Sequence, residues 1–366
     1  MAGNAKVSIQ LPPLSPELRG AFQKFYQDAY NGVEPSSEAF DEAALRYFDH
    51  ARENPDAVDQ FFEAFTLLWN ERLRRGEFGR ASDVWTWALR PALAWETQRS
   101  GRLHKGAAFY FAAMTEILAG DLVAGYLYAH RALEEDRLTH RSATPQTPSL
   151  SLVAIDAENT HQAFRGWVME KARFLEAALA TFRRESSRRF GFKDLRSKFL
   201  GKPEFVEPTF LFSYSIARLR RLESLMPGGS DSDFAAQLRL NILFDLTLVI
   251  DHLLRPFAPG KWQFIELAEA LSSRAQLAVD RAGLQAINGG FREDFAATMA
   301  AVLEGRYRVP SGQQLSGAAK DLAVAYGCRN RGAHHLSGGA VVSKSFGALR
   351  QSLLNTVFLA VDSLPA

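Results

Sequence analysis

The feature that most constrains this chain is the spacing of its apolar residues. Over most of the 366 residues, apolar side chains recur three and four positions apart, which is typical of helices that bury one face. Alternation with a period of two, which would indicate strands, is scarce. Proline and glycine lie mostly between the periodic segments, so the pattern predicts an all-α protein. The expected helices are 15–32, 37–53, 55–75, 79–98, 103–119, 121–138, 153–186, 209–226, 231–255, 261–281, 291–305, 314–329 and 343–363.

Charge and cysteine content exclude several classes of protein. The 43 Lys and Arg residues nearly balance the 41 Asp and Glu residues, and the formal charge of +2 argues against a strong nonspecific polyanion binder. The lone Cys328 excludes an internal disulfide framework and a multi-cysteine zinc site. The most apolar run, 240–254, is short and contains charged residues, and 1–14 has no apolar core of signal-peptide length. We therefore expect a cytoplasmic protein without a membrane segment.

Two breaks in the helical pattern predict the domain organisation. Residues 139–152 are rich in Ser, Thr and Pro, and Pro203 and Pro208 interrupt the chain a second time. We expect three parts, listed in chain order: a helical-repeat-like domain at 1–140, a linker with a basic helical segment at 141–204, and a helical bundle at 205–366.

A weak internal repeat marks the first part. Gly76 and Gly120 each follow a helix end and precede a helix that begins with small residues, which allow two antiparallel helices to pack closely. This arrangement resembles tetratricopeptide-like repeats, although the spacing exceeds that family's roughly 34 residues. A generic bundle of α-hairpins is the alternative. The many aromatic residues of 1–140 are expected in the core and at interfaces, and helical-repeat domains of this kind often present a groove to a protein partner.

The segment with the clearest chemistry lies near the end of the chain. Arg329 and Asn330 are followed after three more residues by His334 and His335, between an expected helix and the last apolar helix. Histidine moves protons near neutral pH, so it can act as a general acid or base. The guanidinium fork of Arg suits phosphate oxygens. A spacing of four intervening residues places Arg329 and His334 about one turn apart, facing one cleft.

The order of an acid-bearing apolar helix, intermediate helices, Arg-Asn-x-x-x-His and a terminal helix resembles the HEPN superfamily of four-helix bundles. Arg329, Asn330 and His334 match its motif residue by residue, and His335 is the reserve. The resemblance covers the last 140–160 residues. It implies a metal-independent endoribonuclease without a cofactor, acting on RNA as a homodimer in which two motifs form one composite site. It further implies a toxin or an antiviral-defence effector.

Other interpretations stay open for these residues. Arg329 and Arg331 also suit the last turn of a helix, where cations favour the dipole, and the two histidines also suit an exposed loop. If the motif has no catalytic role, the chain is either a catalytically inactive HEPN-like module that binds nucleotide or protein, or a structural protein in which the motif occurs by chance. Cys328 is interpreted as a small buried residue rather than as a thiol nucleophile, and a metal site is not favoured.

Two further sets of residues complete the candidate site. Asp245 and Asp251 lie in the apolar helix 231–255, where buried carboxylates need partners. Asp245 is the preferred residue to orient the Arg or His of the motif, and pairing with Arg239 or Arg255 is the alternative. Phenylalanines interleave the basic stretch 183–202, and we favour a place in the core for them over stacking on RNA bases. The candidate RNA-binding residues are Arg188, Arg189, Lys193 and Arg331.

Overall fold

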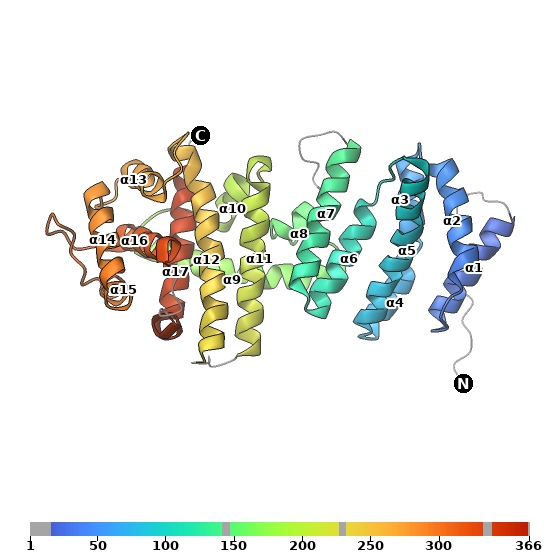
Figure 1. The fold of residues 1–366 in the computed structure, drawn as a ribbon, viewed down its shortest axis with the longest axis horizontal. Coiled ribbons are helices and arrows are strands. Elements are labelled where there is room, and N and C mark those ends of the chain that lie inside the picture. The colour runs from blue at the N-terminus through green and yellow to red at the C-terminus, as the bar shows by residue number, and fades with distance from the viewer. Residues whose placement is uncertain (1–15, 141–146, 227–231, 332–338, 365–366) are drawn as a thin grey trace. The chain divides into compact units, whose positions relative to one another are not determined.

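The computed structural model describes residues 16–140, 147–226, 232–331 and 339–364. Those residues are almost entirely helical and contain no strand, only an isolated antiparallel bridge between Arg308 and Gln314, so the all-α prediction is confirmed (Figure 1). The chain folds as two compact units, Met1–Leu150 and Ser151–Ala366. No helix within the described ranges combines the length and apolarity that crossing a membrane requires.

In the first unit most helices pack on a neighbour in the chain, and some also pack on helices further away in the sequence. α5 contacts α2, α4 and α6, and α6 forms an extensive hairpin with α7. Gly125 of α7 faces α6 so closely that a Cβ atom there would meet the Ile117 side chain. The helices are α1 (Pro16–Tyr30), α2 (Ser37–Ala51), α3 (Pro55–Glu63), α4 (Thr66–Arg74), α5 (Phe78–Arg99), α6 (Gly106–Ala119) and α7 (Leu122–His140).

Local signals in the sequence fix several of these helix ends. The Asn54 side chain accepts hydrogen bonds from the backbone N–H groups of Asp56 and Ala57, at 3.1 and 3.4 Å, and Pro55 occupies the first turn of α3. Gly76 and Gly120 adopt left-handed φ angles of 71° and 97° after α4 and α6. The expected stops at these positions are confirmed.

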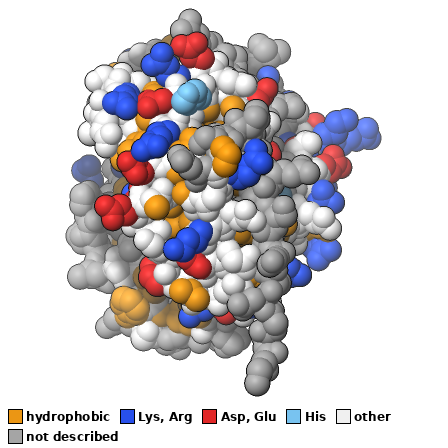
Figure 2. All heavy atoms as spheres, turned by 90° about the vertical axis from the view of Figure 1, so that its right-hand side faces the viewer, with side chains coloured by type: hydrophobic (Ala, Val, Ile, Leu, Met, Phe, Trp, Pro, Cys, Tyr) orange, Lys and Arg blue, Asp and Glu red, His pale blue; other side chains and the backbone are white. Residues whose placement is uncertain are grey.

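Aromatic side chains form the core of the first unit, as expected. Phe61, Trp69 and Trp85 are each no more than 1% exposed. The Trp69 indole donates a hydrogen bond to the Thr115 hydroxyl at 2.7 Å, which satisfies its buried N–H group. On the face that Figure 2 presents, acidic and basic side chains are interspersed among the described residues.

The second unit is built around α12 and α17, which pack along each other. α12 also contacts α11, α13 and α16, and α17 also contacts α9, α13, α15 and α16. The helices are α9 (Gln162–Ser186), α10 (Phe192–Leu195), α11 (Val206–Leu225), α12 (Asp233–Leu254), α13 (Phe264–Ala275), α14 (Arg281–Glu293), α15 (Phe295–Leu303), α16 (Gly317–Arg331) and α17 (Gly339–Ser363); the short helix α8 (Pro148–Val153) spans the division between the units.

Several helices differ from the expected ranges. The expected helix 55–75 is two helices, α3 and α4. The expected helix 153–186 gives way to α8 and α9, because Asp156 caps a turn between them by accepting from the N–H groups of Glu158 and Asn159. The two helices expected over 261–305 are three, α13, α14 and α15.

The segment expected as a linker and basic helix, 141–204, belongs from Ser151 onward to the second unit rather than standing apart from it. The reason is apolar burial: Phe190 and Phe199 are 1% and 0% exposed, and α9 packs on α17. These two phenylalanines are core residues, which confirms for them the favoured prediction that the phenylalanines of the basic stretch lie in the core.

Candidate functional site

The last turns of α16 direct consecutive side chains to different neighbours. Each residue of a helix is rotated by about 100° from the one before it. Gly327 faces α14 and α15 so closely that a Cβ atom would collide with the Phe291 ring. Cys328 is buried, and burial raises the pKa of its thiol to about 12, so the thiolate that a nucleophile needs is absent at neutral pH. The interpretation of Cys328 as a buried structural residue therefore holds.

Arg329 turns toward α12. Its Nε atom lies 3.9 Å from the Asp251 carboxylate, which also binds Arg255 at 3.2 Å. Among the described residues this Nε atom is buried and has no hydrogen-bond partner, while the whole side chain remains 35% exposed. The guanidinium thus lies within ion-pair distance of Asp251 through its Nε atom, and about a third of the side chain is exposed.

Asp245, the preferred orienting residue from the sequence, has another partner. Its carboxylate accepts a hydrogen bond from Arg218 of α11 at 2.6 Å. Burial raises the pKa of Asp245 above its usual range, and Arg218 only partly offsets this. The carboxylate near Arg329 is instead Asp251, six residues further along α12, and the pairing with Arg255 that the sequence offered as the alternative is also made by Asp251.

The remaining candidate residues divide into three groups. His334 and His335 lie outside the described residues, and so does the side chain of Arg331. Arg188 is engaged within the fold, where it forms an ion pair with Asp362 of α17 at 2.6 Å. Arg189 and Lys193 are exposed.

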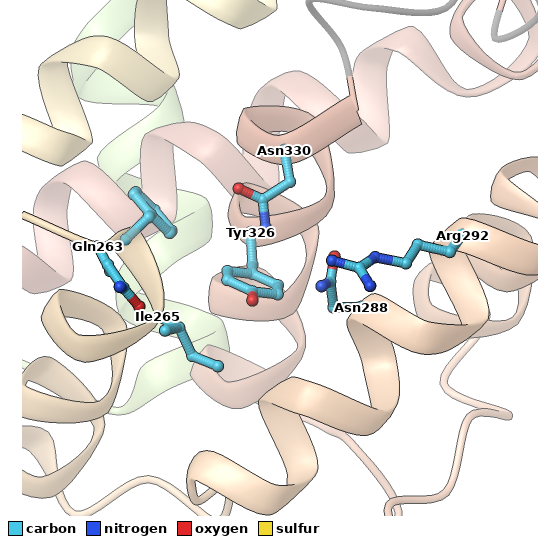
Figure 3. A pocket seen from close by; sticks show the side chains of 7 residues that line it. Gln263, Ile265, Asn288, Arg292, Tyr326 and Asn330 are labelled. Carbon is cyan, nitrogen blue, oxygen red and sulfur yellow. The ribbon is translucent and has the colours of Figure 1, made fainter.

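Asn330, the second residue of the motif, lines a pocket of about 450 Å³ between α13, α14 and α16. In Figure 3 the Tyr326 ring lies at its centre, one helical turn before Asn330. Asn288 and Arg292, also one turn apart, project from α14 on one side, and residues at the start of α13 form the other. The lining residues are Gln263, Phe264, Ile265, Asn288, Arg292, Tyr326 and Asn330.

This pocket is polar and positively charged. Burial raises the pKa of Tyr326, against a hydrogen bond with Asn330 and the charges of Arg292 and Arg281, which lower it. The net effect is a rise, so the phenol keeps its proton at neutral pH. Arg292 is exposed and forms no ion pair with any described residue. Among the seven lining residues none is acidic, so the pocket suits a neutral or anionic polar ligand.

Sequence reasoning missed every lining residue of this pocket except Asn330. The spacing of Tyr326 and Asn330, four residues apart on one helix, is a signal that the sequence contained. Asn288 and Arg292 have the same spacing, but α14 itself was not expected as a separate helix.

Metal ligands do not gather within the described part of the chain, where no group of three or more His, Cys, Asp or Glu side chains is placed to hold an ion.

Comparison with known proteins adds no further assignment. A scan against protein-family models found no matching family, and searches of curated proteins and of solved structures returned no match.

Proposed function

We propose that the second unit is a HEPN-type endoribonuclease that cleaves RNA without a metal ion and acts as a homodimer. The observation that carries the proposal is the placement of Arg329. Its guanidinium sits at the end of α16, is anchored by Asp251, and remains one-third exposed within six residues of two histidines. Phosphodiester cleavage by general acid–base catalysis requires a fixed cation and a group that moves protons, and we assign these roles to Arg329 and to His334 or His335.

The arrangement of helices around Arg329 supports the same proposal. α12 packs against α11, α16 and α17, and α16 packs against α17. We take these four as the bundle helices of the HEPN-like domain, with α9, α10, α13, α14 and α15 as additions around it. Arg329 and Asn330 then lie at the end of the third bundle helix, and the proposed homodimer brings two such helix ends together.

In the proposed reaction the ribose 2′-OH attacks the adjacent phosphorus atom and the P–O5′ bond breaks. One histidine, His334 or His335, takes the proton of the 2′-OH group, and its counterpart in the second subunit donates a proton to the leaving 5′ oxygen. Arg329 stabilises the negative charge that builds on the phosphate oxygens. One product carries a 2′,3′-cyclic phosphate and the other a 5′-hydroxyl group, and the proposed reaction needs no metal ion.

We also propose that the first unit is a tetratricopeptide-like scaffold that binds a protein partner or an antitoxin, and that RNA cleavage serves a toxin or antiviral-defence role. The support is the packing of successive helices on their chain neighbours, above all the close α6–α7 hairpin. Domains of this kind present helical surfaces to other proteins.

RNA cleavage in EDTA tests the proposed activity. The full-length protein is incubated with mixed-sequence RNA, and Arg329→Ala, His334→Ala and His335→Ala are compared with it. We expect cleavage by the unaltered protein and a loss of about 10²-fold or more for Arg329→Ala and for one of the two histidine variants. Arg306→Ala is the matched control, because Arg306 is exposed and pairs only locally with Glu304. Cleavage that survives in all three motif variants, or that requires added metal, contradicts the proposal.

The contact between Arg329 and Asp251 also favours a second candidate, a HEPN-like module that binds nucleotide or protein and does not cut RNA. A carboxylate 3.9 Å from the guanidinium offsets part of its positive charge. Asp251→Asn separates the two roles. If Asp251 positions a catalytic Arg329, the substitution lowers the cleavage rate. If Asp251 instead neutralises it, the substitution raises RNA affinity and no cleavage is seen with either protein.

A further inference from the structure

We propose that the pocket between α13, α14 and α16 is a nucleobase-binding subsite that selects the base next to the cleaved phosphate. The inference rests on the proposed ribonuclease function and names the part of the RNA that the pocket reads. Its basis is the set of side chains that converge there, shown in Figure 3.

The polar lining suits the edge of a base. Asn288 and Asn330 carry amide groups, each with donors and an acceptor, and Gln263 adds a third amide at the opposite wall. Side-chain amides recognise bases through paired donor and acceptor bonds, as Asn and Gln do with adenine. Asn330 follows Tyr326 by one helical turn, so its amide and the Tyr326 phenol line the pocket from the same helix.

The aromatic lining residues support the pocket from within. Phe264 and Tyr326 lie with their ring centroids 5.9 Å apart and their planes tilted by 31°, and both side chains are buried, at 6% and 3% exposed. Two packed rings hold the wall of the pocket in place. The three amides then supply the hydrogen-bonding groups that the edge of one planar heterocycle needs.

The charge of the pocket suits the phosphate that accompanies each base. Arg292 is exposed at the pocket, forms no ion pair with a described residue, and its guanidinium offers a bidentate contact to phosphate oxygens. No carboxylate among the lining residues repels an anion. The volume of about 450 Å³ lies within the range of small-molecule sites, roughly 300–1,000 Å³, and so admits one nucleotide unit.

Asn330 connects this pocket to the proposed site of cleavage. It is the residue next to Arg329 in the chain, and the two side chains leave α16 in different directions, toward the pocket and toward Asp251. In the proposed complex, a strand whose scissile phosphate lies at Arg329 places a neighbouring base in the pocket. Cleavage then depends on the identity of that base.

Direct binding tests the pocket independently of catalysis. The full-length protein is titrated calorimetrically with each of the four nucleoside 5′-monophosphates, with the corresponding nucleosides and with inorganic phosphate. We expect one base to bind best, and we expect Asn288→Ala to weaken its binding about tenfold, the loss of one or two hydrogen bonds. Arg292→Gln reduces the advantage of the monophosphate over the nucleoside. Asn241→Ala, an exposed Asn on α12 bonded to Gln237, is the matched control.

The cleavage pattern provides the second readout. Cut sites in mixed-sequence RNA are mapped for the unaltered protein, for Asn288→Ala and for Asn241→Ala. We expect a base preference beside the cut that Asn288→Ala flattens and Asn241→Ala preserves. Equal affinity for all four monophosphates, or for inorganic phosphate alone, overturns the inference, and so does a cut-site pattern that Asn288→Ala leaves unchanged. If the unaltered protein cuts no RNA while a monophosphate binds in an Asn288-dependent manner, the proposed function fails and the base site stands.

Discussion

His104 of the first unit offers a quantitative test of the electrostatics of this fold. Its Nδ1 atom lies 3.0 Å from the Asp59 carboxylate of α3, and its Nε2 atom lies 2.9 Å from the Asp136 carboxylate of α7. Ionised carboxylates only accept hydrogen bonds, so both ring nitrogens carry protons and the imidazole is a cation. The side chain is 9% exposed and ties the segment before α6 to two helices distant in the sequence.

The pKa of His104 gives the size and sign of its contribution. Burial lowers the pKa, but the hydrogen bonds to Asp136 and Asp59 outweigh burial and raise it from 6.5 to about 9. At 1.36 kcal/mol per pKa unit, this difference stabilises the folded state by about 3 kcal/mol. Because the folded form holds the proton more tightly, the full benefit is present below pH 6.5. It is lost as the pH rises through about 9.

Two measurements check this reasoning. Urea unfolding of the unaltered protein and of His104→Gln is followed by tryptophan fluorescence between pH 6 and pH 10. We expect the stability gap between them to narrow by about 3 kcal/mol over that range. His50→Gln, a change at an exposed histidine of α2, serves as the control for the substitution itself. NMR titration of the His104 ring places its midpoint near pH 9. A midpoint below pH 7, or a gap that does not change with pH, refutes the reasoning.

Three further predictions concern the second unit. Gly327→Ala places a methyl group against the Phe291 ring of α14, and we expect it to lower the free energy of unfolding by about 1–3 kcal/mol in urea denaturation. Gly289→Ala is the control, because this helical glycine of α14 has open space around it and the substitution does not destabilise the fold. Arg218→Ala leaves the half-buried Asp245 carboxylate without its cation, raises the pKa of that carboxyl further, and lowers the free energy of unfolding by about 1–3 kcal/mol at pH 7. This loss of stability shrinks on acidification, because the protonated carboxyl needs no cation. An equal loss at pH 4 and pH 7 argues against an ion pair at this position. Cys328 resists iodoacetamide at pH 8 in the folded protein and reacts in urea, as measured by intact mass; rapid labelling of the folded chain contradicts its burial.

The parts of the fold that the sequence predicts well depend on local chemistry. Asn54 and Pro55 begin α3, and Gly76 and Gly120 follow the ends of α4 and α6. All four act through backbone geometry and short-range hydrogen bonds, so a reader of the sequence can predict their effects without knowing the tertiary structure. The helix α14 was missed for the opposite reason. Gly283 and Gly290 interrupt its helical pattern, yet Gly283 packs against Val309, and Gly290 against Thr298, where a Cβ atom would be crowded. Only the tertiary contact explains glycine there.

The candidate site also contains residues that local sequence predicts and residues that only tertiary packing brings together. Arg329 and Asn330 were identified because their pairing with downstream histidines is a short-range pattern. The choice between Asp245 and Asp251 depended on how α12 meets α11 and α16, and the same helix carries both acids. The pocket was missed because its residues come from three helices and converge only in the folded unit.

The chemistry of the RNA ends tests the central claim most directly. Fragments produced by the full-length protein in EDTA are analysed by mass spectrometry for the group at their 3′ ends. The account predicts 2′,3′-cyclic phosphate ends that disappear with Arg329→Ala and persist with Arg306→Ala. Intact RNA, or 3′-hydroxyl ends that form only when Mg²⁺ is supplied, would contradict it.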